Sequence, residues 1–124
     1  MRACPDIPVA LNHTGFPWDR SDAGLELWRR AMKALAACEQ VCCKLSCLCL
    51  QDGPWEYEDN RRIVLEAIGI FGIDRCMFAS NFPVDSLRVS FERMFQDFKR
   101  MTGELSASER RKLFHDNAAR FYRL

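Results

Sequence analysis

Three polar side chains that follow short apolar runs are the first candidates for chemistry. Asn12 and His13 come at the end of the apolar run 7–12, and Asn81 follows the apolar run 75–80. A neutral imidazole at His13 can polarise a carbonyl, take a proton near neutral pH or bind a metal. The Asn81 amide can orient a carbonyl by hydrogen bonds but cannot act as a carboxylate base. We take His13 and Asn81 as catalytic candidates and Asn12 as a substrate-binding one, with loop-bonded His13 and turn-capping Asn81 as structural alternatives.

Two further side chains are candidates for binding a substrate. An extended strand places Lys44 and Ser46 on one face, where an inward Lys44 can hold a substrate carboxylate. A lysine that reaches solvent from a strand end is the structural alternative. Trp18 and Trp55 lie in loops between strands and helices and can face a ligand, whereas Trp28 falls on an apolar helical stripe and is predicted to be core.

Strands and helices must alternate to position these side chains. Apolar runs predict three short strands, at 7–12, 41–50 and 75–80. Helical spacing of apolar residues predicts helices carrying Leu25, Trp28, Met32 and Leu35; Val64, Ala67, Ile68 and Phe71; Leu87, Phe91, Met94, Phe95 and Phe98; and Leu113 with Phe114. The predicted helix ends are Ser21 or Asp22, Asp59 or Asn60, Gly72, the capping box from Ser106 to Glu109, and Asn117 before a final turn.

Alternating strands and helices indicate an α/β fold, because parallel neighbours are joined by right-handed crossovers rather than by tight hairpins. At 124 residues, the chain is expected to form one domain, 1–124. Ligands of such folds bind beyond the carboxyl ends of the strands, which is where His13 and Asn81 are expected.

Composition excludes several classes of partner. The 18 basic and 17 acidic residues give a charge of +1 with no basic stripe, so nucleic acid is not expected. No run of about 18 apolar residues predicts a membrane span, and no apolar stretch of a signal peptide follows the N-terminus, so a cytoplasmic protein is expected. The seven cysteines are odd in number and lack paired C-x2-C knuckles, which favours reduced thiols over disulfides or structural zinc.

Four stretches of the chain resemble the amidohydrolase-related TIM-barrel hydrolases, a family that includes lactonases acting on sugar lactones and on pyrone dicarboxylate. They are residues 9–15, 41–48, 71–85 and 113–122, the last ending in Asn-Ala-Ala-Arg-Phe-Tyr. The resemblance implies that the chain holds the last three βα units of an eight-unit barrel, followed by C-terminal helices. The chain would then be a partial barrel, and most of the N-terminal half of the whole barrel would lie outside it.

The resemblance also implies an incomplete site. Relatives carry a His-x-His pair on the first strand, whereas the only histidines here are His13 and His115. Asn81 stands where some members have an aspartate that activates water. The resemblance allows a divalent metal in full-length members of the family, but this sequence holds no complete site for one. A small-molecule substrate is expected for the full-length form.

Three hypotheses follow. In the first, the chain is the C-terminal part of a hydrolase acting on lactones or similar cyclic esters, inactive when truncated, with His13 polarising the carbonyl or positioning water and Asn81 orienting the substrate. In the second, it is a non-catalytic interaction module that associates with itself or a larger barrel through open sheet edges. In the third, it is a gene-model fragment without a selected function.

Overall fold

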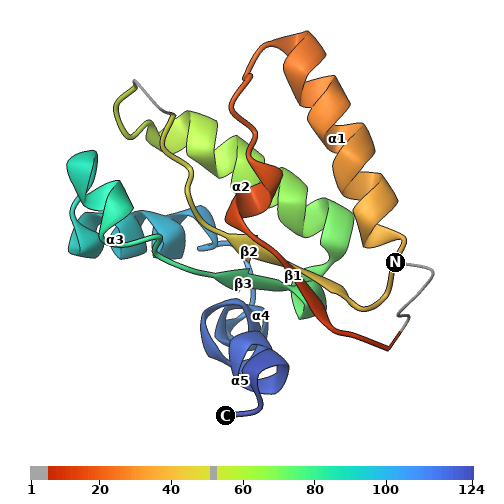
Figure 1. Ribbon diagram of the computed structural model, residues 1–124. Helices are drawn as coiled ribbons and strands as arrows, with labels where there is room; N and C mark the ends of the chain where they lie inside the picture. Colours follow the sequence, from red (N-terminus) through yellow and green to blue (C-terminus); the bar gives the residue numbers. More distant parts are fainter. Residues whose placement is uncertain (1–5, 51–52) are drawn as a thin grey trace.

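The computed structural model describes residues 6–50 and 53–124 and contains a parallel three-stranded sheet (Figure 1). The strands are β1 (Val9–Leu11), β2 (Val41–Leu45) and β3 (Cys76–Phe78), in the order β1-β2-β3. Both pairs are parallel, which agrees with the predicted α/β class. Each strand is shorter than predicted. β2 ends at Leu45 instead of residue 50 because Cys47 adopts a left-handed backbone (φ 54°) that breaks the extended conformation.

Helices follow each strand. They are α1 (Asp22–Ala36), α2 (Tyr57–Phe71), α3 (Phe91–Met101), α4 (Ala107–Arg111) and α5 (Asn117–Tyr122), with a π-helical turn at Lys112–Asp116 between the last two. Shorter 3-10 turns occupy His13–Gly15, Ile73–Arg75 and Val84–Leu87. Three predicted helix ends are confirmed: Ser21 caps α1, Gly72 ends α2, and Ser106 forms a capping box with Glu109.

Two predicted helix caps are wrong. α2 begins at Tyr57 rather than after Asp59 or Asn60, because the Asp59 carboxylate pairs with Arg20 instead (2.5 Å). Asn117 does not cap the last turn. Its amide nitrogen instead donates to the backbone oxygens of Ile73 (2.6 Å) and Cys76 (2.7 Å), which ties α5 to the start of β3.

The predicted apolar stripe of the third helix is wrong at its start. Leu87 lies in a 3-10 turn, separated from α3 by the cap residue Ser90, and is 80% exposed. Ser90 ends the turn because its hydroxyl accepts from the backbone nitrogen of Arg93 (3.2 Å) and starts a new helix there. Met94 and Phe98 are buried as predicted.

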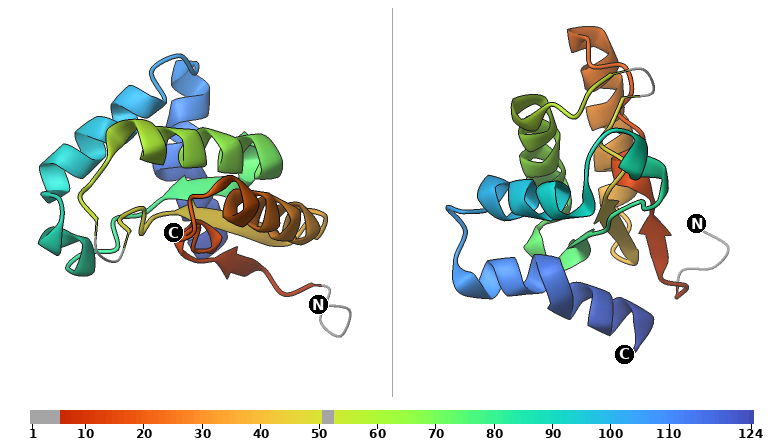
Figure 2. Two further views of the ribbon diagram at one scale, coloured as in Figure 1. Left: turned by 90° about the horizontal axis from the view of Figure 1, so that it is seen from above. Right: turned by 90° about the vertical axis from the view of Figure 1, so that its left-hand side faces the viewer.

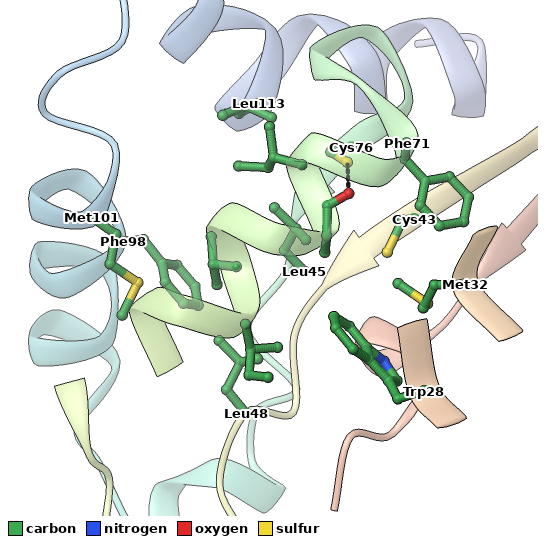
Figure 3. Close-up of a cluster of buried hydrophobic side chains, with 14 of the residues drawn as sticks. Trp28, Met32, Cys43, Leu45, Leu48, Phe71, Cys76, Phe98, Met101 and Leu113 are labelled. Carbon is green, nitrogen blue, oxygen red and sulfur yellow. Dashed lines mark hydrogen bonds between the residues drawn. The ribbon is translucent and has the colours of Figure 1, made fainter. Parts of the chain in front are cut away.

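One cluster of buried side chains joins the sheet to its helices. α1 and α2 lie over one face of the sheet, and α4 and α5 lie beside β3, below the strands in Figure 1 (Figures 1 and 2). The cluster includes Trp28, Met32, Cys43, Leu45, Leu48, Phe71, Cys76, Phe98, Met101 and Leu113 (Figure 3). Alternation along β2 sends Cys43 and Leu45 into this core and leaves Lys44 half-buried on the opposite face.

The described cysteines are free thiols, and Cys43 and Cys76 are fully buried core residues. Burial raises the pKa of Cys76 to about 12 and that of Cys43 well above its usual range, so both behave as small apolar side chains. In the described part of the chain, no helix is both long and apolar enough to cross a membrane.

Candidate active site

A left-handed turn directly after β1 holds the histidine candidate. Four consecutive residues, His13, Thr14, Gly15 and Phe16, have φ values of 58°, 54°, 68° and 54°. Three of them carry side chains that disfavour this conformation, so the turn must be fixed by contacts from outside it. At Gly15, a Cβ would come within 2.9 Å of the Met32 sulfur, so only glycine fits without a shift.

Thr14 is the residue that fixes this turn. It is fully buried, and its hydroxyl donates to the backbone oxygen of Ser46 (3.1 Å) and accepts from the backbone nitrogen of the same residue (3.2 Å). The Trp28 indole nitrogen donates to the backbone oxygen of Thr14 (2.9 Å). Trp28 is core, as predicted, and it also connects α1 to the turn.

The turn brings His13 against Ser46, which directly follows β2. His13 Nδ1 and Ser46 Oγ lie 3.0 Å apart, and the imidazole contacts the Phe16 ring edge-to-face at 5.1 Å. The alternative of a histidine bonded only to loop backbone is therefore wrong for this side chain. Burial and the charge of Lys44 lower the pKa of His13 below its ordinary value of 6.5, and Asp85 opposes the change. The imidazole is thus mainly neutral at pH 7.

Asn81 follows β3 and pairs with an acid that sequence reasoning did not select. The Asn81 backbone is left-handed (φ 55°), and its amide nitrogen donates to Asp85 Oδ1 (2.9 Å). Asp85 is only 3% exposed, and its Oδ2 has no hydrogen-bond partner among the described residues. Burial raises the pKa of Asp85, while the Asn81 hydrogen bond and the His13 charge oppose the rise. His13 and Asp85 therefore lie close enough to influence each other across the ends of the strands.

The three substrate-binding candidates lie around this cluster at different depths. Lys44 is half-buried on β2 and acts on His13 through its charge. Asn12 is exposed, and its backbone oxygen accepts from Gly15 (3.1 Å). Trp18 is 46% exposed and helps to line a pocket of about 260 Å³ whose other walls come from Cys47, Cys49, Leu50, Val84, Asp85, Leu87 and Arg88.

Trp55, the other tryptophan expected to face a ligand, has a structural partner. Its indole nitrogen donates to Asp97 Oδ2 (2.8 Å), and its ring packs against Phe98 (6.0 Å between centroids). It connects the loop before α2 to α3.

Comparison with known proteins shows the family of this chain. A family model described as amidohydrolase matches residues 1–124. The chain belongs to the amidohydrolase family. The chain is 37% identical to the L-fucono-1,5-lactonase of Burkholderia multivorans over 94% of its own length and 43% of the lactonase. It is 50% identical to the protein y4mH of Sinorhizobium fredii over 99% of its length and 41% of that protein.

Solved structures agree with the amidohydrolase assignment. An amidohydrolase from Burkholderia multivorans with bound HEPES superposes with a TM-score of 0.85 at 35% identity, over 93% of this chain and 44% of that one. A second crystal form of the same amidohydrolase, with bound zinc, gives a TM-score of 0.86 at 34% identity over 93% of this chain and 43% of that one. The resemblance to lactonase-like amidohydrolases is confirmed, and the chain spans about two fifths of the length of these relatives. Three parallel βα units are consistent with part of a barrel.

The buried Asp85 gives a stability prediction with a definite sign. Its pKa is raised in the folded state, so its stabilising contribution is present below the unfolded pKa and lost as pH rises through the folded pKa. Replacing Asp85 by asparagine is therefore expected to raise the free energy of unfolding at pH 7, by roughly 0.5–2 kcal/mol. The gain should vanish as the pH falls toward 3.8, and urea unfolding at several pH values measures it.

Asp116 is the matched control because its pKa is lowered, by hydrogen bonds from His115 and Arg111. Its contribution is present above the unfolded pKa and lost as pH falls, so Asp116→Asn is expected to lower stability slightly at pH 7. If Asp85→Asn destabilised the chain at pH 7 as Asp116→Asn does, the ionised form of Asp85 would have to be favoured by the fold.

Proposed function

We propose that the chain supplies the C-terminal part of the active site of a TIM-barrel lactonase that hydrolyses sugar lactones or similar cyclic esters. The observation that carries this proposal is the grouping of His13, Ser46, Asn81 and Asp85 beyond the carboxyl ends of three adjacent parallel strands. Barrel enzymes place their catalytic side chains at this carboxyl-terminal end of the strands. The similarity to an L-fucono-1,5-lactonase supports a lactone as the substrate class.

Hydrolysis of a lactone by water needs a proton acceptor that is unprotonated at the working pH. The oxygen of water bonds to the carbonyl carbon, the ring C–O bond breaks, and the ring oxygen takes up a proton to become a hydroxyl. The lowered pKa of His13 keeps its imidazole available to take the proton from water and return it to the ring oxygen. Lys44, whose charge already acts on His13, would hold the carboxylate that forms when the lactone ring opens.

The hydrogen bond to Ser46 decides which nitrogen of His13 is used. If Nδ1–H donates to the Ser46 hydroxyl, Nε2 keeps its lone pair and acts as a base. If the hydroxyl donates to Nδ1, Nε2–H polarises the lactone carbonyl instead. The base role requires a neutral imidazole, so the rate should fall as pH drops through the pKa of His13 if Nε2 is the base. An imidazolium would still polarise the carbonyl through Nε2–H.

The described residues do not form a metal site by themselves. No group of three or more histidine, cysteine or acidic side chains that is suited to a metal ion occurs in residues 6–50 and 53–124. His115, the other histidine, instead pairs through its Nδ1 with Asp116 in the π-helical turn (2.9 Å).

A second candidate function rests on the sheet edges. Among the described residues, no strand pairs with the outer edge of β1 or of β3. In a lactonase, these edges would pair with the remaining strands of the barrel. Without those strands, the edges favour association with a second copy or with a larger barrel. Light scattering that shows a monodisperse monomer would contradict this second function.

A graft tests the lactonase proposal. Residues 1–124 replace the matching segment of the Burkholderia multivorans lactonase, and hydrolysis of L-fucono-1,5-lactone is followed by proton release. We expect hydrolysis by the graft and only the uncatalysed rate with the isolated chain, because the chain spans 43% of the lactonase. A graft that folds, as judged by circular dichroism, but does not hydrolyse the lactone would rule the proposal out.

A further inference from the structure

The Asp85 carboxylate is unusual because it is buried with only one of its two oxygens hydrogen-bonded. Oδ1 accepts from Asn81 (2.9 Å), whereas Oδ2 has no partner among the described residues. Buried acids are usually fully paired, and those that are not concentrate at functional sites.

The carboxylate of Asp85 is not needed to hold the local turn. The 3-10 turn Val84–Leu87 is already closed by backbone bonds from Ser86 to Pro83 (3.0 Å) and from Arg88 to Asp85 (3.0 Å). The Ser86 hydroxyl also donates to the backbone oxygen of Pro83 (2.6 Å). An uncharged side chain at position 85 would leave every one of these bonds in place.

The contact does fix which end of the Asn81 amide faces the carboxylate. An ionised carboxylate only accepts hydrogen bonds, so it selects the NH₂ end of the amide. A second bond runs from the Asp85 backbone nitrogen to the Asn81 backbone oxygen (3.2 Å), so the two residues are joined twice. No hydrogen bond from the described residues reaches the Asn81 amide oxygen, which leaves that oxygen for a ligand.

We propose that Asp85 is a positioning residue that holds Asn81 with its amide oxygen toward the ligand. The identity of the ligand rests on the proposed lactonase function, whereas the orientation of Asn81 does not. An amide oxygen accepts hydrogen bonds, so Asn81 takes a donor, either the attacking water or a ring hydroxyl. The lactone carbonyl oxygen is itself an acceptor, so the Asn81 amide oxygen cannot hydrogen-bond to it.

The side-chain amide of Asn81 reports this orientation directly by NMR. The ¹⁵N-labelled 124-residue chain is used, and the Asn81 signal is assigned by its absence in Asn81→Ser. Gln96 is the internal reference, because its amide donates to the carboxylate of Glu92 (3.1 Å) on an exposed face. We expect solvent exchange of the Asn81 amide protons to be at least about tenfold slower than that of Gln96, since its acceptor is buried.

Two variants separate a positioning role from simple burial. Asp85→Asn keeps an acceptor oxygen and is expected to keep the slow exchange to within about threefold. Asp85→Leu keeps the bulk but removes the acceptor, so the Asn81 amide should exchange as fast as Gln96. The Asn117 amide, bonded to backbone oxygens elsewhere, shows that each variant is folded.

Three results would overturn the proposal: fast exchange of Asn81 in the wild-type chain, slow exchange retained in Asp85→Leu, or fast exchange in Asp85→Asn. If Asp85→Leu does not fold, the wild-type chain and Asp85→Asn decide the matter. No lactone is used in these measurements, so an inactive graft and a freely exchanging Asn81 amide are separate results.

Discussion

Replacing His13 by glutamine in the grafted lactonase is expected to lower kcat/KM for L-fucono-1,5-lactone by about 10²–10⁴-fold. Glutamine can still form a hydrogen bond with Ser46, but it cannot take a proton from water. The pH profile of the unsubstituted graft should show activity falling as pH drops through a value below 6.5, because protonation removes the neutral imidazole. Initial rates of proton release across this range measure both effects.

The control for this variant is His115→Gln. His115 is exposed and pairs with Asp116 far along the chain from His13, so its loss is expected to change the rate by no more than about twofold. A His13→Gln graft that kept more than a tenth of the activity would show that the imidazole is not the proton acceptor. The activity would then have to come from residues supplied by the rest of the barrel.

Replacing Thr14 by valine is expected to lower the free energy of unfolding by about 2–4 kcal/mol. Valine has nearly the same shape but no hydroxyl, so two buried backbone groups of Ser46 lose their partner. The left-handed turn would also lose its attachment to the end of β2, and the pKa of His13 should return toward 6.5. Urea unfolding and an NMR titration of His13 measure the two consequences.

Thr102→Val is the matched control, since Thr102 is equally buried. Its hydroxyl donates to the backbone oxygen of Phe98 (2.9 Å), which also accepts from the Thr102 backbone nitrogen (3.3 Å). That oxygen keeps a partner in the variant, so a smaller loss of about 1 kcal/mol is expected. Equal losses at the two positions would mean that the Thr14 bonds contribute nothing special to the turn.

Local signals predicted the elements of the fold but not all of their ends. Ser21 and the pair Ser106 and Glu109 were found because a cap bonds to residues three positions away, within reach of a sequence pattern. Asp59 looks the same in the sequence, but its carboxylate is used by Arg20, 39 residues earlier. Such a competing partner cannot be read from local spacing.

The same limit explains the candidate site. His13 and Asn81 were predicted because each follows an apolar run. Both lie beyond the carboxyl ends of the strands, as expected. Asp85 was missed because an acid two residues after a proline resembles an ordinary turn residue. The importance of Thr14 was also missed, since its partner Ser46 lies 32 residues away. These roles depend on contacts that exist only in the folded chain.

The bonds between Thr14 and Ser46 also determine where this polypeptide can be recombined with its homologues. A crossover placed between positions 14 and 46 would combine a turn from one parent with a strand end from another, and the two would not have been selected to fit. A crossover ahead of residue 7 transfers both together, with Trp28 between them. Shuffled libraries should therefore retain function mostly in clones that inherit residues 13–46 as one block.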